Sequence, residues 1–485
     1  MARALLIVPP FLKYSAGPLL GPALLKARAL QRGHWCSILD LNAHFIRRYA
    51  PDRDLNRGVF VGDHDKPRES SFNTLSNVET VFLDKVLGAL LPIVGSGNLS
   101  KNEALRRLRF GFLRHHEVEK AGSVLAHSSF GQWVRTLLES KQTERPDLVG
   151  VSLLHAGQVI PSVAVSMIAK ELWPDSFIAW GGPHVSGIGK AIQEDISDRM
   201  FAADLFVSGH AEETFASLLD RLSPSEPYRH PTGLVEGVRG GSVIPVFENL
   251  DLYDSPPVLP AQSTLGCAYG RCAFCTYPAM EPKPSKLDLC ITIDSVVDAA
   301  QQLGATVSIK DSLVTAGRLR EIGATIGGRV QWSACTKLNS KLSLPLLKSL
   351  NDKGLATLEV GLESLLVDTQ RRVAKVHPPH LFEEFLGQVA QVPDLSLVVN
   401  YMTGFPWEDP TASLIMRDKA ESMLHDYLGC RGKLEHNQFE LERLSPMAED
   451  PDRFHIDKRS LKFWPWASIV EYNSVDRQVV GITTV

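Results

Sequence analysis

The chain has 485 residues, of which 44% are hydrophobic and 22% are charged, and its formal net charge is -4 with an isoelectric point near 6.4. This length predicts two or three domains with separate cores, and the balanced charge excludes a dedicated nucleic-acid binder. No run of residues approaches the roughly 20 apolar positions that a membrane-spanning helix needs. We therefore expect neither nucleic acid nor membrane as a partner.

The cysteines and the first residues point to the cytoplasm. The chain has seven cysteines, an odd number, and three of them are close together. This distribution favours metal ligation in a reducing compartment over a framework of disulfides. The start, MARALLIVPPF, lacks the apolar core and cleavage site of a signal peptide.

The first part of the chain alternates short apolar runs with helical patterns. The predicted strands lie at 3–8, 36–42, 147–154, 176–182 and 203–210. Helices are predicted between 15 and Gly33, at 160–173 and after residue 210. This alternation predicts an α/β domain over residues 1–223, a Rossmann-like, doubly wound parallel sheet.

A long insertion separates the second predicted strand from the third. It covers residues 43–146 and contains helical patterns at 79–94 and 130–142. A structureless loop of that length is improbable in a compact domain, so we expect a helical insertion. Such a subdomain can cover one face of a ligand.

The ends of the later strands in this domain are built from small residues. They have the sequences VSLLHAG, WGGPHVSG and VSGHAEE. Doubly wound sheets bind ligands at the carboxyl ends of their strands, where glycine lets a bulky ligand approach the backbone. No G-x-G-x-x-G follows the first strand, so a dinucleotide is weakly supported. The candidate binding residues are Ser152, Leu153, Leu154, Gly181, Gly182, His184, Ser208 and Gly209.

A second alternation of strands and helices follows a segment rich in Pro, Gly and Ser at 224–258, which we expect to be a linker. The strands predicted after the cysteine loop lie at 305–311, 330–338, 356–364, 395–406 and 433–446. Repeated strand–helix units predict a partial or full parallel α/β barrel over 259–430. Residues 431–485 are expected to complete the barrel and the substrate pocket.

Three cysteines, Cys267, Cys272 and Cys275, form a C-x4-C-x2-C motif directly after the first strand of this half. Three thiolates can ligate three irons of a [4Fe-4S] cluster and leave the fourth iron open to a ligand. The alternative is a zinc site with Cys290 as the fourth thiolate, although Cys290 has no close partner in sequence. Cys36, Cys335 and Cys430 are expected to be buried small apolar residues.

This half resembles the radical S-adenosylmethionine superfamily. The cysteine loop has an aromatic residue, Phe274, before its last cysteine, and the following strands end in SIKDSL, GLES and GFP. The usual spacing in that superfamily is C-x3-C-x2-C, so the first gap here is one residue longer. The form GCAYGRCAFC is similar to a variant among cobalamin-linked members.

The resemblance implies roles for residues at the strand ends. Asp311 and Ser312 would meet the methionyl ammonium of S-adenosylmethionine, and Lys337 its carboxylate. Glu363 and Ser364 would meet the ribose, and the loop of Tyr277 and the turn at Gly404 would pack on the adenine. Together the residues assigned to S-adenosylmethionine are Phe274, Tyr277, Asp311, Ser312, Lys337, Glu363, Ser364 and Gly404. A salt bridge at the barrel rim is an equally good interpretation for Lys337.

The whole chain is similar to cobalamin-binding radical enzymes, in which a Rossmann-like corrinoid domain precedes the barrel. The resemblance assigns the strand-end residues of the first domain to cobalamin. His64 lies in the insertion, but its neighbours do not form the D-x-H-x-x-G motif that supplies an axial histidine. His64 is therefore expected to be a solvated loop residue.

The resemblance implies a methyltransferase that moves a methyl group from S-adenosylmethionine, via methylcobalamin, to a poorly activated carbon. The substrate class is a natural product or a peptide, and the electron donor a flavodoxin or a ferredoxin. One alternative keeps both cofactors but cyclises, rearranges or oxidises the substrate without methylation. Another is a corrinoid or iron–sulfur sensor without catalysis.

The tail contains Trp464, Trp466 and Tyr472 within nine residues. Such aromatic side chains can line a substrate pocket, but we expect them to pack the terminal segment onto the barrel.

Overall fold

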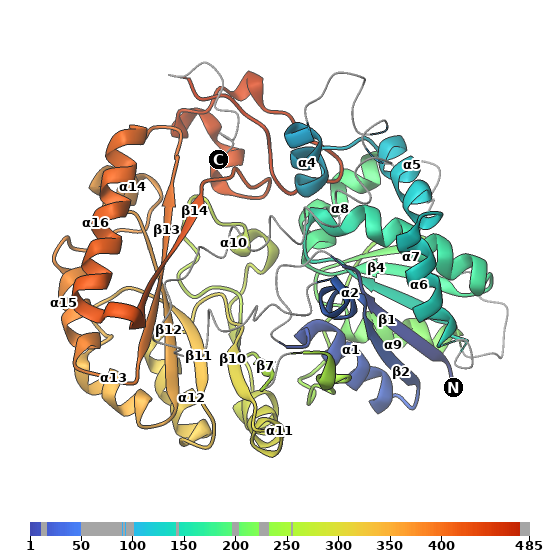
Figure 1. The fold of residues 1–485 in the computed structure, drawn as a ribbon, viewed down its shortest axis with the longest axis horizontal. Coiled ribbons are helices and arrows are strands. Elements are labelled where there is room, and N and C mark those ends of the chain that lie inside the picture. Colours follow the sequence, from blue (N-terminus) through green and yellow to red (C-terminus); the bar gives the residue numbers. More distant parts are fainter. Residues whose placement is uncertain are drawn as a thin grey trace.

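The structure is a computed structural model that describes residues 1–10, 17–49, 90, 93, 101–141, 145–195, 203–222, 232–253 and 256–475. Figure 1 shows two strand-and-helix domains, each built around one sheet, with helix α10 (Tyr277–Met280) between them. Both sheets contain six parallel strands. The predicted α/β class with two parallel domains is confirmed.

The first sheet has the strand order β2-β1-β3-β4-β5-β6. Its strands are β1 Arg3–Val8, β2 Trp35–Asp40, β3 Leu148–Ser152, β4 Phe177–Gly181, β5 Leu205–Ser208 and β6 Gly233–Glu236. The order reverses between β1 and β3, which is the switch point where such sheets bind ligands. Strand β6 lies inside the segment predicted as a linker and was not expected, because none of its residues is fully buried.

Both faces of this sheet are covered, which explains the continuous apolar runs of its strands. Leu5 and Ile7 of β1 belong to one core, whereas Ala4 and Leu6 belong to the other. The covering helices are α1 Leu20–Gln31, α7 Val159–Leu172, α8 Pro183–Asp195 and α9 Glu212–Leu222. Helices α1 and α9 share one face, and α7 and α8 share the other.

The insertion is helical where the structure describes it. Its helices are α2 Leu41–Tyr49, α4 Lys101–Phe110, α5 His115–Ala126 and α6 Ser129–Glu139. Helices α5 and α6 pack on α7 and so thicken one face of the first domain. The helix predicted at 130–142 is confirmed as α6. The one predicted at 79–94 lies outside the described residues except for 90 and 93, and His64 lies outside them too.

The second sheet has the order β14-β13-β12-β11-β10-β7. Its strands are β7 Val258–Ala261, β10 Thr306–Ile309, β11 Trp332–Lys337, β12 Leu355–Glu363, β13 Ser396–Thr403 and β14 Gly432–Gln438. Its helices are α11 Ser295–Leu303, α12 Ala316–Ile326, α13 Leu344–Asn351, α14 Val367–Arg372, α15 Leu381–Ala390 and α16 Pro410–Leu428. Because β7 and β14 are the two edges of this sheet, the barrel is partial.

Short elements complete the second domain. Strands β8 Thr264–Leu265 and β9 Ser285–Lys286 form an antiparallel pair that flanks the cysteine loop. A π-helical turn at Cys290–Asp294 precedes α11, and α17 Pro446–Glu449 follows β14.

The C-terminal segment joins the two domains, and in Figure 1 it crosses from β14 toward α4. Trp466 is buried in the core of the first domain, where its ring centroid lies 6.3 Å from that of Trp180. Tyr472 instead packs beside Phe439 of the second domain. The prediction that these aromatic residues pack the tail is confirmed, but Trp466 packs it onto the first domain rather than the barrel.

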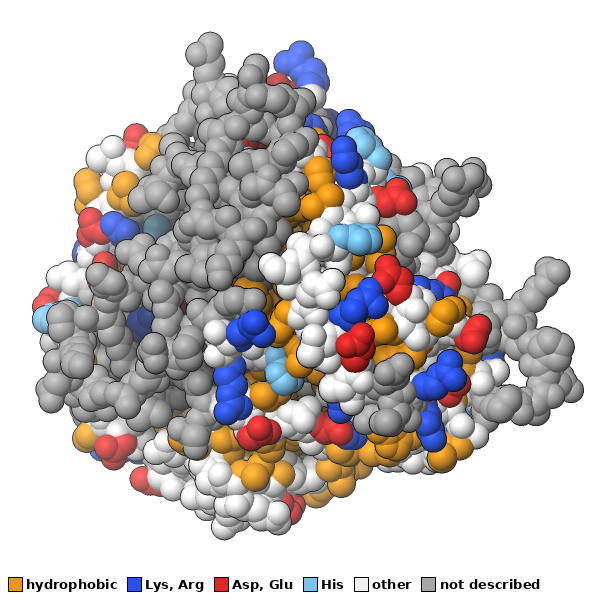
Figure 2. Space-filling view, turned by 45° about the vertical axis from the view of Figure 1, so that its right-hand side comes forward, with side chains coloured by type: hydrophobic (Ala, Val, Ile, Leu, Met, Phe, Trp, Pro, Cys, Tyr) orange, Lys and Arg blue, Asp and Glu red, His pale blue; other side chains and the backbone are white. Residues whose placement is uncertain are grey.

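Figure 2 shows one face of the molecule, on which the described basic, acidic and hydrophobic side chains are interspersed. None of the helices in the described ranges combines the length and the hydropathy that crossing a bilayer requires.

Gly182, at the turn after β4, tests how tightly this strand end is built. Its φ is +103°, and a Cβ atom there would lie 2.4 Å from Leu153 O. Gly182→Ala should therefore lower the free energy of unfolding by about 1–3 kcal/mol or more. The matched control is Gly181→Ala, whose Cβ would lie 3.5 Å from its nearest neighbour, Val207 O. Equal urea midpoints for the two variants would contradict this account.

Candidate cofactor site

The ends of three neighbouring strands lie side by side at one edge of the first sheet. Ser152 of β3 pairs with Gly181 of β4, and β5 follows with Ser208 at its end. Beyond the strands, Leu153 N–H donates to Gly181 O at 2.8 Å, and His184 N–H donates to Leu153 O at 3.1 Å. The other residues predicted for the corrinoid, Leu154, Gly182 and Gly209, follow in the same turns.

A buried glutamine that the sequence analysis missed spans the switch point. Gln158 is 0% exposed, accepts a hydrogen bond from Leu154 N–H at 2.7 Å, and donates to Pro9 O at 2.7 Å. It therefore fixes the end of β3 against the end of β1. In the sequence it is one polar residue before a helix, which carries no signal of this contact.

His184 is placed differently from its predicted role. Its ring is buried, and its Nε2 atom lies 3.1 Å from Trp466 O. Burial lowers the pKa of this imidazole to about 3, so the ring is neutral and donates to the carbonyl. The side chain thus fastens the C-terminal segment, whereas Gly209 stays in an open turn, where its N–H donates to Ser186 Oγ at 2.8 Å.

The cysteine loop leaves the end of β7 and carries all three predicted cluster ligands. Cys267, Cys272 and Cys275 are partly exposed and form no disulfide. Cys275 N–H donates to Cys272 O at 3.2 Å, and Ala273 N–H donates to Val373 O at 3.0 Å. The second half of the loop is therefore held as a turn against the end of α14.

The extra residue in the first gap is accommodated by a glycine. Gly270 has φ of +57°, a conformation that favours glycine, and its N–H donates to Cys267 Sγ at 3.5 Å. Beside it, the Tyr269 hydroxyl donates to Ala374 O.

The thiols lie beside a buried cation. Burial raises the pKa of Cys272 to about 11, and the Lys375 ammonium acts in the opposite direction. Burial alone would lower the pKa of Lys375, but the Glu363 carboxylate raises it above its usual value. Lys375 therefore offsets part of the effect of burial, which on balance still favours the neutral thiol of Cys272.

Two residues after β10, Asp311 and Ser312, form hydrogen bonds with the segment that leads into the cysteine loop. Asp311 is 5% exposed and accepts hydrogen bonds from Ser263 N–H at 2.7 Å, from Thr264 Oγ1 at 2.7 Å and from the Ser263 hydroxyl. Ser312 Oγ donates to Gly266 O at 2.7 Å. Asp311 thus uses most of its acceptor capacity within the protein, which differs from its predicted role toward an ammonium group.

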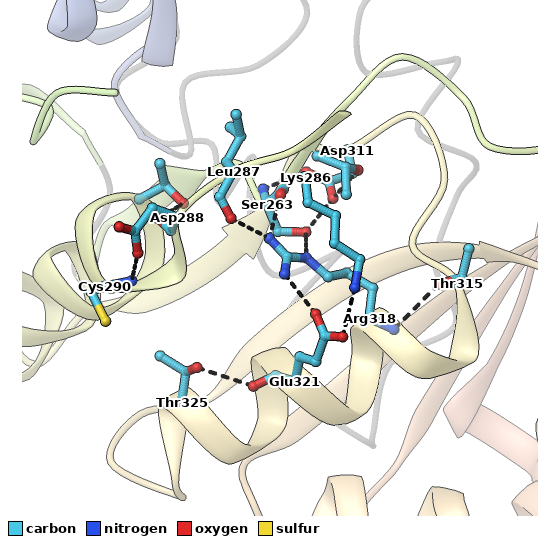
Figure 3. A network of polar contacts seen from close by, with 12 residues as sticks. Ser263, Lys286, Leu287, Asp288, Cys290, Asp311, Thr315, Arg318, Glu321 and Thr325 are labelled. Carbon is cyan, nitrogen blue, oxygen red and sulfur yellow. Dashed lines mark hydrogen bonds and ion pairs between the residues drawn. The ribbon is translucent and has the colours of Figure 1, made fainter. Parts of the chain in front are cut away.

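Arg318 of α12 supports the same end of β7 (Figure 3). Its buried guanidinium donates to Ser263 O and Leu287 O, each at 2.6 Å, and pairs with Glu321 at 2.6 Å. Lys286 of β9 pairs with the same Glu321 at 2.7 Å. The buried Arg318 guanidinium therefore has a hydrogen-bond acceptor for its charge on each side, and its network holds the first residues of the cysteine loop in place.

The GLES sequence at the end of β12 is also committed to internal contacts. Glu363 pairs with Lys375 and lies at a bulge in the ladder with φ of +67°. Ser364 is 1% exposed, and its hydroxyl accepts from Leu366 N–H at 3.1 Å. Ser364 therefore supports the turn into α14, which differs from the predicted contact with ribose. Lys375 is a further residue that the sequence analysis missed.

Lys337 and Tyr277 both lie close to the cysteine loop. Lys337 Nζ lies 4.6 Å from the ring centroid of Tyr269 in the cysteine loop. Burial and then the neighbouring Lys375 lower the pKa of Lys337. Tyr277 is 47% exposed at the start of α10, two residues after Cys275.

The GFP turn after β13 also reaches the cysteine loop. Gly404, at φ of +87°, donates its N–H to Glu408 Oε2 at 3.1 Å. The ring centroid of Phe405 lies 6.3 Å from that of Phe274. The turn that contains Gly404 and Phe405 therefore contacts the cysteine loop at Phe274. Glu408 was not expected.

One carboxylate connects the edges of the two sheets. Glu281, after α10, accepts from Gly266 N–H at 2.7 Å and pairs with His210, which follows β5. Hydrogen bonds to Glu212 and then Glu281 raise the pKa of His210 to about 9, so the imidazole is charged at neutral pH. The residue before Cys267 is thereby tied to the β5 turn of the first domain.

The other four cysteines lie outside the cysteine loop. Cys290 is exposed, and no three His, Cys, Asp or Glu side chains within the described ranges converge on one metal ion. This finding covers Cys267, Cys272 and Cys275 as well, so it does not separate a zinc site from an iron–sulfur cluster. Cys36 is buried and Cys335 is partly exposed, but Cys430 is exposed, which corrects its predicted burial.

No protein-family model matches the chain, and no curated protein sequence does. Among solved structures, the chain is similar to the radical S-adenosylmethionine methyltransferase TsrM from Kitasatospora setae with cobalamin and a [4Fe-4S] cluster bound. The TM-score is 0.59 at 15% identity, over 92% of this chain and 77% of that one. A TsrM structure with tryptophan substrate and the analogue aza-SAM gives 0.57 at 14% identity, over 92% and 75%.

The chain is also similar to the cobalamin-dependent radical enzyme OxsB with aqua-cobalamin and S-adenosylmethionine bound. Here the TM-score is 0.62 at 11% identity, over 98% of this chain and 65% of OxsB. The chain thus spans less than two thirds of OxsB. At these identities the likeness shows a common fold, and it confirms the predicted arrangement of a Rossmann-like domain followed by a partial barrel.

Asp311 provides a test of how the loop is held. Asp311→Ala removes three hydrogen bonds to a charged group and should lower the free energy of unfolding on the order of 2–4 kcal/mol. We also expect less iron per chain after anaerobic reconstitution. The matched control is Asp288→Ala, which removes one acceptor from Cys290 N–H farther along the chain. Unchanged iron content with only weaker S-adenosylmethionine binding would instead support the role predicted from sequence.

Proposed function

We propose that this chain, which has the fold of cobalamin-dependent radical S-adenosylmethionine enzymes, is itself such an enzyme. We further propose that it transfers a methyl group to a poorly activated carbon of a small molecule. The observation that carries this proposal is the contact of Glu281 with both Gly266 and His210. This contact supports the proposal because it joins the turn after β5 to the residue before Cys267.

The cysteine loop fits an iron–sulfur cluster. Its three thiols are partly exposed and share one loop, and those of Cys272 and Cys275 lie near the Lys375 ammonium. Cys267, Cys272 and Cys275 would hold the cluster, and the C-x4-C-x2-C spacing leaves one iron for S-adenosylmethionine. When bound, the cluster supplies an electron to S-adenosylmethionine, and cobalamin supplies a carrier for its methyl group.

The residues around the loop suit a zwitterionic, nucleoside-bearing ligand. Lys337 presents an ammonium next to Tyr269, and Phe274 packs beside Phe405, the residue after Gly404, to form an apolar surface. We assign Lys337 to the methionyl carboxylate and this surface with Tyr277 to the adenine. Asp311, Ser312, Glu363 and Ser364 act mainly by holding the loop and the strand ends in place.

The edge of the first sheet suits a large planar ligand. Gly209 has positive φ, and no atom lies within 4 Å of a Cβ added there, whereas the positive φ of Gly182 forms a tight turn against Leu153. We assign Ser152, Leu153, Leu154, Gly181, Gly182, Ser208 and Gly209 to cobalamin. The His184 imidazole is engaged with Trp466 O, so we do not assign it as an axial ligand.

The reaction balances with two molecules of S-adenosylmethionine. One gives up its methyl group and leaves as S-adenosylhomocysteine. The other accepts one electron, takes a hydrogen atom from the substrate carbon and leaves as methionine and 5'-deoxyadenosine. Replacing that hydrogen with the methyl group requires two electrons in total, for which we propose a flavodoxin or a ferredoxin. The chain's part is to hold these groups together and to exclude water.

Product analysis tests this proposal. Anaerobically reconstituted protein with cobalamin, reductant and S-adenosylmethionine should form both S-adenosylhomocysteine and 5'-deoxyadenosine. Cys272→Ala should abolish the cluster absorbance and 5'-deoxyadenosine but keep corrinoid binding. The matched control is Cys290→Ala, an exposed cysteine outside the loop, which should behave as wild type.

Other product patterns distinguish the alternatives. Formation of 5'-deoxyadenosine alone would support a radical reaction without methylation, and S-adenosylhomocysteine alone a polar methyl transfer. Neither product, from protein loaded with iron and cobalamin, would overturn the proposal and leave a sensor as the better account.

A further inference from the structure

A buried ion pair at the end of β12 lies against the cysteine loop. The Lys375 ammonium pairs with the Glu363 carboxylate, and only 11% and 10% of these two side chains are exposed. A buried pair is weak evidence for a gain in stability, because removing two charges from water costs about as much as their attraction returns. The reaction proposed above assigns no role to the lysine. Its position beside the cysteines is therefore the more informative feature.

The backbone directly before Lys375 is bonded to the cysteine loop on both sides of its second cysteine. The carbonyl of Val373 accepts a hydrogen bond from Ala273 N–H at 3.0 Å, and the carbonyl of Ala374 accepts one from the Tyr269 hydroxyl. The side chain of Lys375 therefore starts from a point that is fixed next to the middle of the cysteine motif.

A glycine makes room for the lysine side chain on β12. A Cβ atom at Gly361 would lie 2.2 Å from Lys375 Nζ and 2.5 Å from Glu363 Oε1, so any other residue there would displace the pair. Glu363 itself has φ of +67° at a bulge in the ladder, a costly conformation for a residue with a side chain. Such strain persists only where the surrounding structure imposes it, and it is concentrated at functional sites. The end of β12 is thus built around this ion pair.

The positive end of the pair acts on the cysteines more strongly than the negative end. Burial is the largest influence on the pKa of the Cys272 and Cys275 thiols and raises both values. Within the pair, the Lys375 ammonium lowers these pKa values, and its effect on each thiol exceeds that of Glu363, which raises them. The pair therefore creates a positive electrostatic potential at these two sulfurs. Because both of its members are buried, solvent ions screen this potential little.

A [4Fe-4S] cluster gains one negative charge when it is reduced, so its reduction potential depends on the charges around it. A cation nearby in a medium of low dielectric constant stabilises the reduced form. We infer that Lys375 raises the reduction potential of the proposed cluster, and that Glu363 holds its ammonium in place. An electron donor of given potential then keeps a larger share of the cluster reduced. This inference rests on the function proposed above, because it requires the cluster.

A redox titration of charge variants tests this inference. The full chain is reconstituted anaerobically with cluster and cobalamin but without S-adenosylmethionine, and the electron paramagnetic resonance signal of the reduced cluster is recorded at each potential. At the wild-type midpoint, Lys375→Gln should lower the ratio of reduced to oxidised cluster about three- to tenfold, because it leaves the charge of Glu363 alone beside the sulfurs. A tenfold change corresponds to about 59 mV for one electron.

The other member of the pair provides the opposite change. Glu363→Gln should raise the same ratio, by a smaller factor, and the double variant should lie between the two single variants. Comparing the double variant with Glu363→Gln isolates the lysine without leaving a buried carboxylate unpaired, so the test holds even if Lys375→Gln takes up little iron. The matched control, Lys341→Gln, changes an exposed lysine in the loop after β11 and should leave the potential unchanged.

The outcomes separate this inference from the proposed function. In protein loaded with the cluster, shifts of the same sign in the two single variants, or equal potentials in Glu363→Gln and the double variant, would overturn the inference. Either result would indicate a purely structural role for the pair and would leave the proposed reaction intact. Wild-type protein that takes up no iron–sulfur cluster would overturn both.

Discussion

The Glu281 carboxylate is the contact on which the two halves of the site depend. It accepts from Gly266 N–H, one residue before the first cluster cysteine, and pairs with His210 at the turn after β5. In each sheet the carboxyl ends of the strands form one candidate site, and each of these sites suits a different cofactor. The two cofactors can meet only if these strand ends face each other. Glu281 connects the two sets of strand ends beside Cys267.

The parts around this contact are held by buried polar groups with nearly complete sets of partners. Asp311 and Arg318 fix the start of the cysteine loop, and Gln158 fixes the switch point of the first sheet. At the other end, Trp466 and the Arg106–Glu471 pair bind the C-terminal segment to the first domain. A buried donor or acceptor left without a partner costs about 1–3 kcal/mol, so these networks favour one arrangement of the loops.

Much of the fold followed from the sequence, because buried parallel strands give continuous apolar runs and the glycines at their ends mark sharp turns. The partly buried β6 gave no such signal. The cysteine motif could be recognised in the sequence because its spacing is local, and its role as a cluster site stays a prediction. Gln158, Lys375, Glu408 and Glu281 could not be recognised, because each acts through partners that only the tertiary structure brings near. For the same reason Asp311 and Ser364 lay in the predicted places but hold the backbone more than they face a ligand.

The most direct test of the central claim, that the two cofactor edges face each other, is electron paramagnetic resonance. Protein reconstituted with cluster and corrinoid would be poised to hold the one-electron-reduced cluster together with cob(II)alamin. The account predicts that reducing the cluster broadens or splits the cob(II)alamin signal, and that Cys272→Ala abolishes the effect. A spectrum equal to the sum of two isolated centres, in protein loaded with both, would contradict it.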